Sequence, residues 1–189
     1  MIMNLFCKGY TGGGPILIVP QNLVSMWNAI EDYRIATSER LTSVLQMYPL
    51  CKQSMPPAVL FHHCSDSNFH VYYDDKTFAV ITVEYANRGH EATIANIDFF
   101  SDTVDKKEWI TIEHYGGNMV IADAASPEMG ADMTRPGYIN LGWQGKILDE
   151  TDANVVMITM PAATYKVYYA AHKDDSVSYY GALFVAEGQ

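Results

Sequence analysis

A series of short β-branched and aromatic runs constrains the fold of this chain more than any other feature. Each run is about as long as a typical strand, and residues that favour turns separate the runs. Runs of this kind occupy residues 16–19, 58–61, 69–73, 78–85, 109–112, 119–122, 155–160, 165–171 and 178–186. We therefore expect roughly eight strands in a largely antiparallel sheet.

Three polar or glycine-containing segments join neighbouring runs and predict β-hairpins. The segments are Asp74–Thr77, Tyr115–Asn118 and His172–Ser176. Glycine and asparagine permit the positive φ angles of tight turns, and short polar segments suit exposed turns. We expect hairpins of residues 69–73 with 78–85, 109–112 with 119–122, and 165–171 with 178–186. A longer segment without periodicity, residues 123–137, predicts an extended surface loop.

Helical spacing of apolar residues is confined mainly to the N-terminal half. It predicts an amphipathic helix over residues 20–35, and a shorter one that Thr37 or Ser38 caps and that ends before Pro49. A third helix is expected over residues 89–100, followed by a solvated acidic loop over Asp102–Glu108. The prediction is an α+β fold, with two or three helices beside the antiparallel sheet, in a single domain spanning residues 1–189. With 49% hydrophobic residues, the chain can bury a core of that size.

The charge balance narrows the classes of partner. Twelve basic and 22 acidic residues give a formal net charge of −10, which disfavours nucleic acid and suits either a basic protein partner or solubility alone. No apolar run of transmembrane length and no secretory signal pattern is seen, so we expect no membrane association and a cytoplasmic location. Three cysteines are too few for a disulfide framework.

One cluster contains residue types that bind transition metals: His62, His63, Cys64, Asp66 and His70. Adjacent strand residues point to opposite faces, and no second ligand pair follows at zinc-finger spacing. We therefore predict no metal. A metal- or small-molecule-binding protein centred on His62, Cys64 and His70 stays open as an alternative.

The sequence contains none of the common catalytic motifs, such as a nucleophile elbow or a zinc-protease helix. The glycines of residues 12–14 lack the Gly-Lys-Ser/Thr ending of a phosphate-binding loop. Paired acidic residues fall in predicted turns, where exposed carboxylates are poorly suited to acid–base catalysis. We predict a protein without cofactor that is not an enzyme.

Adjacent tyrosines on two neighbouring predicted strands offer a binding surface. In each of the pairs Tyr168–Tyr169 and Tyr179–Tyr180, one ring must point away from the core. Tyrosine supplies a large contact area at low entropic cost, which suits a protein interface. Ordinary packing across the strands is the alternative interpretation.

Three ordered patches of the sequence resemble a bacterial protein family. They are Gly13–Pro20 with Trp27 and Asp32–Arg34, then Trp109 with Gly117–Pro127, then Met160–Val167. Together they resemble the immunity protein 21 family of polymorphic toxin systems, whose members protect a cell from a cognate toxin. The resemblance implies an immunity protein that binds a toxin domain.

The proposed mode of action combines this resemblance with the acidic charge. Loop carboxylates would replace an anionic substrate in the toxin's cleft and occlude its active site. The predicted toxin-binding carboxylates are Asp102, Asp105 and Glu108, or alternatively Asp149, Glu150 and Asp152. Tyr168 and Tyr180 are the predicted aromatic contacts. A self-associating module that forms a homodimer through exposed strands is a further alternative.

Overall fold

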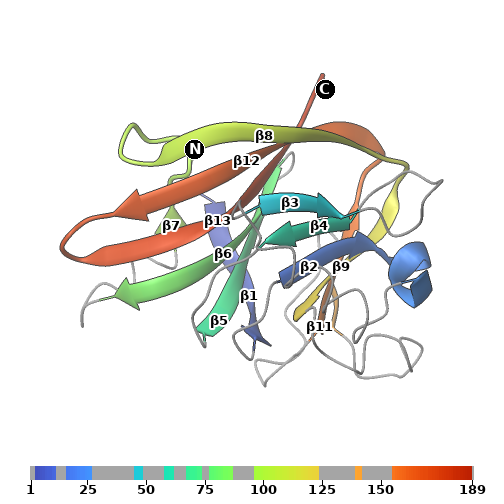
Figure 1. The fold of residues 1–189 in the computed structure, drawn as a ribbon, viewed down its shortest axis with the longest axis horizontal. Coiled ribbons are helices and arrows are strands. Elements are labelled where there is room, and N and C mark those ends of the chain that lie inside the picture. The colour runs from blue at the N-terminus through green and yellow to red at the C-terminus, as the bar shows by residue number, and fades with distance from the viewer. Residues whose placement is uncertain are drawn as a thin grey trace.

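Two β-sheets packed against each other contain most of the described residues (Figure 1). The fold is defined by a computed structural model. It describes residues 3–11, 16–26, 45–48, 58–61, 67–73, 77–86, 96–123, 139–141 and 155–188.

The larger sheet has seven strands in the order β7-β1-β5-β6-β13-β12-β8, and every neighbouring pair is antiparallel. It places β8 at one edge. Its strands are β1 (Met3–Thr11), β5 (Ser67–Tyr73), β6 (Thr77–Ala86), β7 (Asn96–Ile97), β8 (Asp105–His114), β12 (Ala163–Lys173) and β13 (Val177–Ala186).

The smaller sheet has six strands in the order β10-β11-β9-β2-β4-β3, of which only β10 and β11 run parallel. A short 3₁₀ helix, η1 (Gln21–Met26), follows β2. The strands are β2 (Ile16–Pro20), β3 (Leu45–Tyr48), β4 (Ala58–Phe61), β9 (Gly117–Asp123), β10 (Ile139–Leu141) and β11 (Val155–Met160).

Side chains from the facing surfaces of both sheets form an inner core. Ile18 and Ile121 of the smaller sheet and Phe78 and Phe184 of the larger one belong to the same buried cluster. The rings of Phe78 and Phe184 stack with centroids 4.1 Å apart. Alternate residues of β5, β6, β9, β11, β12 and β13 face this core, as a sandwich of two sheets requires.

The opposite face of the larger sheet carries an outer core, which residues 96–104 help to enclose. Phe99 is fully buried there, with its ring 5.5 Å from Tyr72 and 6.0 Å from Tyr179. The central strands are therefore covered on both faces. This explains why residues 77–82 are buried without a break, where one-sided burial would alternate.

The α+β prediction is wrong, because the described residues contain no α-helix and lie mainly in antiparallel sheets. Of the predicted helix over residues 20–35, Pro20 ends strand β2 and residues 21–26 form η1, while residues 27–35 lie outside the described ranges. The end of the second predicted helix is strand β3, which pairs with β4. Helical spacing in so short a window is outweighed when strand pairing satisfies the backbone and buries the same side chains.

The third predicted helix, residues 89–100, ends in β7 and a turn over the part that the structure describes. The Phe100 amide donates to the Asp98 carboxylate at 3.0 Å, and the Ser101 amide donates to the Asp98 carbonyl at 3.2 Å. Aspartate commonly competes with helix formation through such local bonds. No helix within the described residues is long and apolar enough to cross a bilayer.

The strand predictions succeed more often than the connections between strands. The hairpins β5–β6 and β12–β13 are confirmed by their antiparallel registers. The predicted hairpin of residues 109–112 with 119–122 is wrong, since β8 pairs with β12 and β9 pairs with β2 and β11. The predicted acidic loop is also partly wrong, because Asp105–Glu108 begins strand β8. Of the loop predicted over residues 123–137, all but Asp123 lies outside the described residues.

Candidate functional site

The chain changes sheets twice at one corner of the sandwich, and a pocket lies beside this corner. Tyr115 and Gly116 join β8 to β9, while Pro161 and Ala162 join β11 to β12. Gly116 and Gly117 have φ angles of 87° and 102°, which L side chains rarely adopt. A Cβ atom on Gly116 would lie 3.5 Å from the Ala162 nitrogen, so the two links pass close together.

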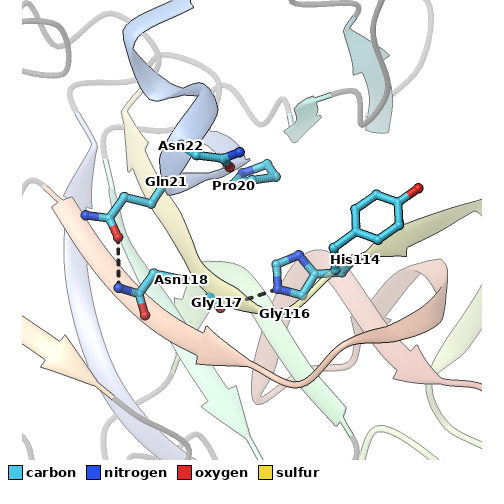
Figure 2. A pocket seen from close by; sticks show the side chains of 8 residues that line it. Pro20, Gln21, Asn22, His114, Gly116, Gly117 and Asn118 are labelled. Carbon is cyan, nitrogen blue, oxygen red and sulfur yellow. Dashed lines mark hydrogen bonds between the residues drawn. The ribbon is translucent and has the colours of Figure 1, made fainter.

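This corner pocket has a volume of about 210 Å³. Figure 2 shows the start of η1 on one side of it and the link between β8 and β9 on the other. The volume lies below the range of about 300 to 1,000 Å³ that is typical of small-molecule sites. The pocket is lined by Pro20, Gln21, Asn22, His114, Tyr115, Gly116, Gly117 and Asn118.

His114 forms a buried wall of the corner pocket, with 6% of its surface exposed. Its Nε2 atom lies 3.3 Å from the Gly117 carbonyl oxygen, and its ring meets the Tyr165 ring edge-on at 6.4 Å. Burial lowers the pKa of His114, and hydrogen bonds to the Gly117 and Met160 carbonyls oppose this shift only in part. The imidazole is therefore neutral at neutral pH.

A chain of side-chain hydrogen bonds fixes another side of the pocket. Asn118 donates through Nδ2 to Oε1 of Gln21 at 2.8 Å, and Thr159 donates to Oδ1 of Asn118 at 2.7 Å. The first bond, drawn in Figure 2, connects β9 to η1, and the second connects β9 to β11. Three elements are thereby held around one amide, which preorganises the pocket.

Tyr115 places an aromatic ring at the rim of the corner pocket. Its side chain is 74% exposed, and its hydroxyl donates to Oε2 of Glu113 at 3.1 Å. This hydrogen bond and the charge of Glu113 raise the pKa of Tyr115. The sequence interpretation missed His114 and Tyr115 as site residues, because Tyr115–Asn118 was assigned only to a hairpin turn.

Three of the predicted toxin-binding carboxylates lie on the exposed surface near one edge of the larger sheet. Asp102 lies in the turn before β8, and Asp105 and Glu108 lie on β8 itself. Glu108 approaches Lys166 at 4.0 Å, while the same lysine pairs with Glu187 at 3.0 Å. Asp149, Glu150 and Asp152 lie outside the described residues.

A lysine within this acidic segment makes contacts with its own turn. The Lys106 ammonium donates to the carbonyls of Ser101 at 3.3 Å and Val104 at 3.4 Å. It also lies 5.9 Å from the centre of the Phe100 ring. These local contacts hold the cation against the turn, beside the outward carboxylates.

The structure separates the two predicted binding tyrosines. Tyr168 lies directly across from Glu108 and packs on the outer core. Tyr180 packs on the inner-core side, where its ring stacks on Tyr169 with centroids 6.4 Å apart. Asp105 and Tyr180 both pair with Ala171, so these three residues lie side by side across β8, β12 and β13. The described members of the predicted set therefore lie on both faces of the larger sheet.

The β12–β13 turn contains a compact polar cluster with a structural role. His172 contacts the Thr103 carbonyl through Nδ1 and the Asp174 carboxylate through Nε2, both at 2.9 Å. The Asp174 carboxylate also accepts from the amides of Ser176 and Val177. Hydrogen bonds from Val177, Ser176 and His172 lower the pKa of Asp174 to about 2. The cluster connects this hairpin to the turn that encloses the outer core.

His70 is the one member of the metal candidate that the structure describes. Its side chain is buried in β5, with 8% exposed, and its ring meets the Tyr72 ring edge-on at 6.5 Å. His62, His63, Cys64 and Asp66 lie outside the described residues. Over the parts of the chain that are described, no three metal-binding side chains come together.

Comparisons with known proteins do not identify a relative of this chain. No family model, no curated protein and no solved structure matches this chain. Function is therefore inferred from the corner pocket, the charged edge of the larger sheet and the sequence resemblance described above.

Proposed function

We propose that this protein is a cytoplasmic immunity protein that binds a cognate bacterial toxin domain and occludes its active site. The supporting observation is a series of exposed carboxylates along one edge of the larger sheet. We name Asp102, Asp105, Glu108 and Glu113 the acidic edge; all four are exposed, and three of them lie on β8.

Electrostatics favour a basic partner for this surface. The chain carries a net charge of −10, and within residues 102–113 the four carboxylates accompany two lysines. One of these, Lys106, is held against its own turn. Complementary charge accelerates encounter and disfavours partners of the same sign. A toxin that acts on an anionic substrate would present a basic cleft of this kind.

The edge strand supports a heterologous partner over self-association. The register between β8 and β12 shifts between Val167 and Tyr168. Charged side chains lie along the edge strand β8. Bulges and edge charges are devices by which proteins prevent one sheet edge from pairing with another copy. Contact through carboxylate side chains is compatible with these features, whereas a continuous strand-to-strand dimer is not favoured.

Co-expression tests this function directly. The protein is expressed together with the toxin domain encoded immediately upstream of its gene, and growth is measured beside a pull-down of the pair. Restored growth with a stable complex is the expected result. Continued toxicity without a complex would rule out that pairing, and a tight homodimer that binds no toxin would instead favour the self-associating module.

A further inference from the structure

The corner pocket has the size for one side chain of a partner protein. At about 210 Å³ it is smaller than most small-molecule sites, and it opens beside the exposed ring of Tyr115. Interfaces derive much of their affinity from a few anchor residues that enter such pockets, with tyrosine and arginine prominent among them. The exposed tyrosine and the adjacent pocket therefore form a compact anchor site.

The charges around the pocket indicate the sign of the side chain that fits. Among the described residues, its polar lining consists of amides, backbone groups, the Tyr115 hydroxyl and a neutral histidine, none of which repels a cation. Glu113 accepts a hydrogen bond from the Tyr115 hydroxyl, so its carboxylate lies close to the pocket rim. An aromatic face beside a carboxylate is a favourable environment for a cation.

We propose that the corner pocket receives an arginine side chain of the basic partner, with the guanidinium at the pocket mouth against the Tyr115 ring and the Glu113 carboxylate nearby. The choice of a basic protein as the source of this arginine rests on the proposed function. Glu113 belongs to the acidic edge, so the pocket would anchor the same partner that the other carboxylates attract.

Arginine fits this site better than lysine for geometric reasons. Its planar guanidinium stacks on aromatic rings and presents five donors in a rigid fork. The amide oxygen of Asn22, which lines the pocket and lies beside Pro20 in Figure 2, is an acceptor of the kind that such a fork uses. The Glu113 carboxylate, which contacts Tyr115 next to the rim, is a charged acceptor of the same kind. A lysine ammonium is compact and strongly hydrated, and it gains less from the ring.

The isolated protein allows a first test without any partner. N-acetyl-arginine amide is titrated into the protein, and NMR shifts of the His114 ring and the Gly117 and Asn118 amides are followed. N-acetyl-citrulline amide has nearly the same shape without the charge and serves as the control. Saturable shifts with the arginine probe alone are expected. No saturable shift, or equal shifts with both probes, would overturn the proposal.

Substitutions at the rim distinguish the contribution of the Tyr115 ring from that of its hydroxyl. Tyr115→Ala should weaken binding of the arginine probe about two- to fivefold, which corresponds to an exposed cation–π contact. Tyr115→Phe keeps the ring and should retain most of the binding, whereas Glu113→Gln should weaken it. Phe100→Ala removes another exposed aromatic residue, 40% accessible, as the matched control and should have no effect. Equal affinity in Tyr115→Ala and wild type would contradict the assignment.

The complex with the toxin distinguishes failure of this proposal from failure of the proposed function. If a toxin complex forms and Tyr115→Ala leaves its affinity unchanged, the binding function stands and the arginine subsite is wrong. If the arginine probe binds with the expected selectivity but no toxin complex forms, the subsite stands and the immunity function is wrong. Weakened toxin binding in Tyr115→Ala, with Phe100→Ala unaffected, supports both.

Discussion

At the corner between the sheets, backbone conformation determines where individual side chains lie. Gly116 and Gly117 adopt positive φ angles, and this local bend redirects the chain from one sheet to the other. His114 consequently ends its strand buried, while Tyr115, the next residue, is exposed at the rim. One buried neutral base and one exposed ring arise from neighbouring positions because alternate strand residues point to opposite sides.

Burial of neutral His114 makes stability depend on pH. Its folded pKa lies below the ordinary value of 6.5, so unfolding takes up a proton at intermediate pH. The stabilising contribution is fully present above pH 6.5 and is lost as pH falls through 6.5 towards the lowered pKa. We expect denaturant unfolding to show a smaller loss of stability on acidification in His114→Gln than in wild type. Identical pH profiles would contradict this prediction.

At the scale of elements, the turn over residues 98–104 acts as a cover for the larger sheet. Phe99 contributes its ring to the outer core, and Val104 of the same turn is buried there. The Thr103 carbonyl meets His172, which joins the cover to the β12–β13 hairpin. The cover therefore buries apolar surface that would otherwise leave one face of the sheet exposed to water.

Two adjacent phenylalanines test this role. Phe99→Ala should lower the free energy of unfolding by about 3 to 5 kcal/mol, the usual cost of removing a fully buried ring. Phe100→Ala should cost less than about 1 kcal/mol, because this ring is 40% exposed and contacts Lys106. Chemical denaturation measures both. Similar losses in the two variants would show that the turn does not cover the core as described.

The sequence predicted strands better than it predicted their arrangement. β-branched runs identify β5, β6, β12 and β13, because such residues suit a buried pleated surface. Local periodicity could not show that β3 pairs with β4 in place of a helix, since sheet pairing depends on residues distant in sequence. The turn between β8 and β9 was recognised, but the change of sheet was not, because the same glycines serve both geometries.

The candidate site was only partly accessible to sequence reasoning. Exposed carboxylates at Asp102, Asp105 and Glu108 follow from charge and high polarity alone. The alignment of Asp105 with Tyr180, and the separation of Tyr168 onto the other face, depend on cross-strand register. The corner pocket could not be predicted from local sequence, because its lining comes from segments that are far apart in the chain. Gln21 and Asn118, for example, are separated by 97 positions.

At the scale of the whole molecule, the described residues form a β-sandwich with an acidic edge. The seven-stranded sheet is covered on both faces, and its edge at β8 carries the exposed carboxylates. A rigid sheet of this kind presents charges with little conformational cost on binding. The net charge of −10 should then affect mainly the rate of encounter with a basic partner.

The most direct test measures the association rate with the purified toxin domain over a range of salt concentrations. The combined variant Asp102→Lys, Asp105→Lys and Glu108→Lys should associate about tenfold more slowly at low salt and show a flatter salt dependence. Lys107→Glu, on the same strand, should associate faster than wild type. Rates that are equal in all three proteins at every salt concentration would contradict recognition through the acidic edge.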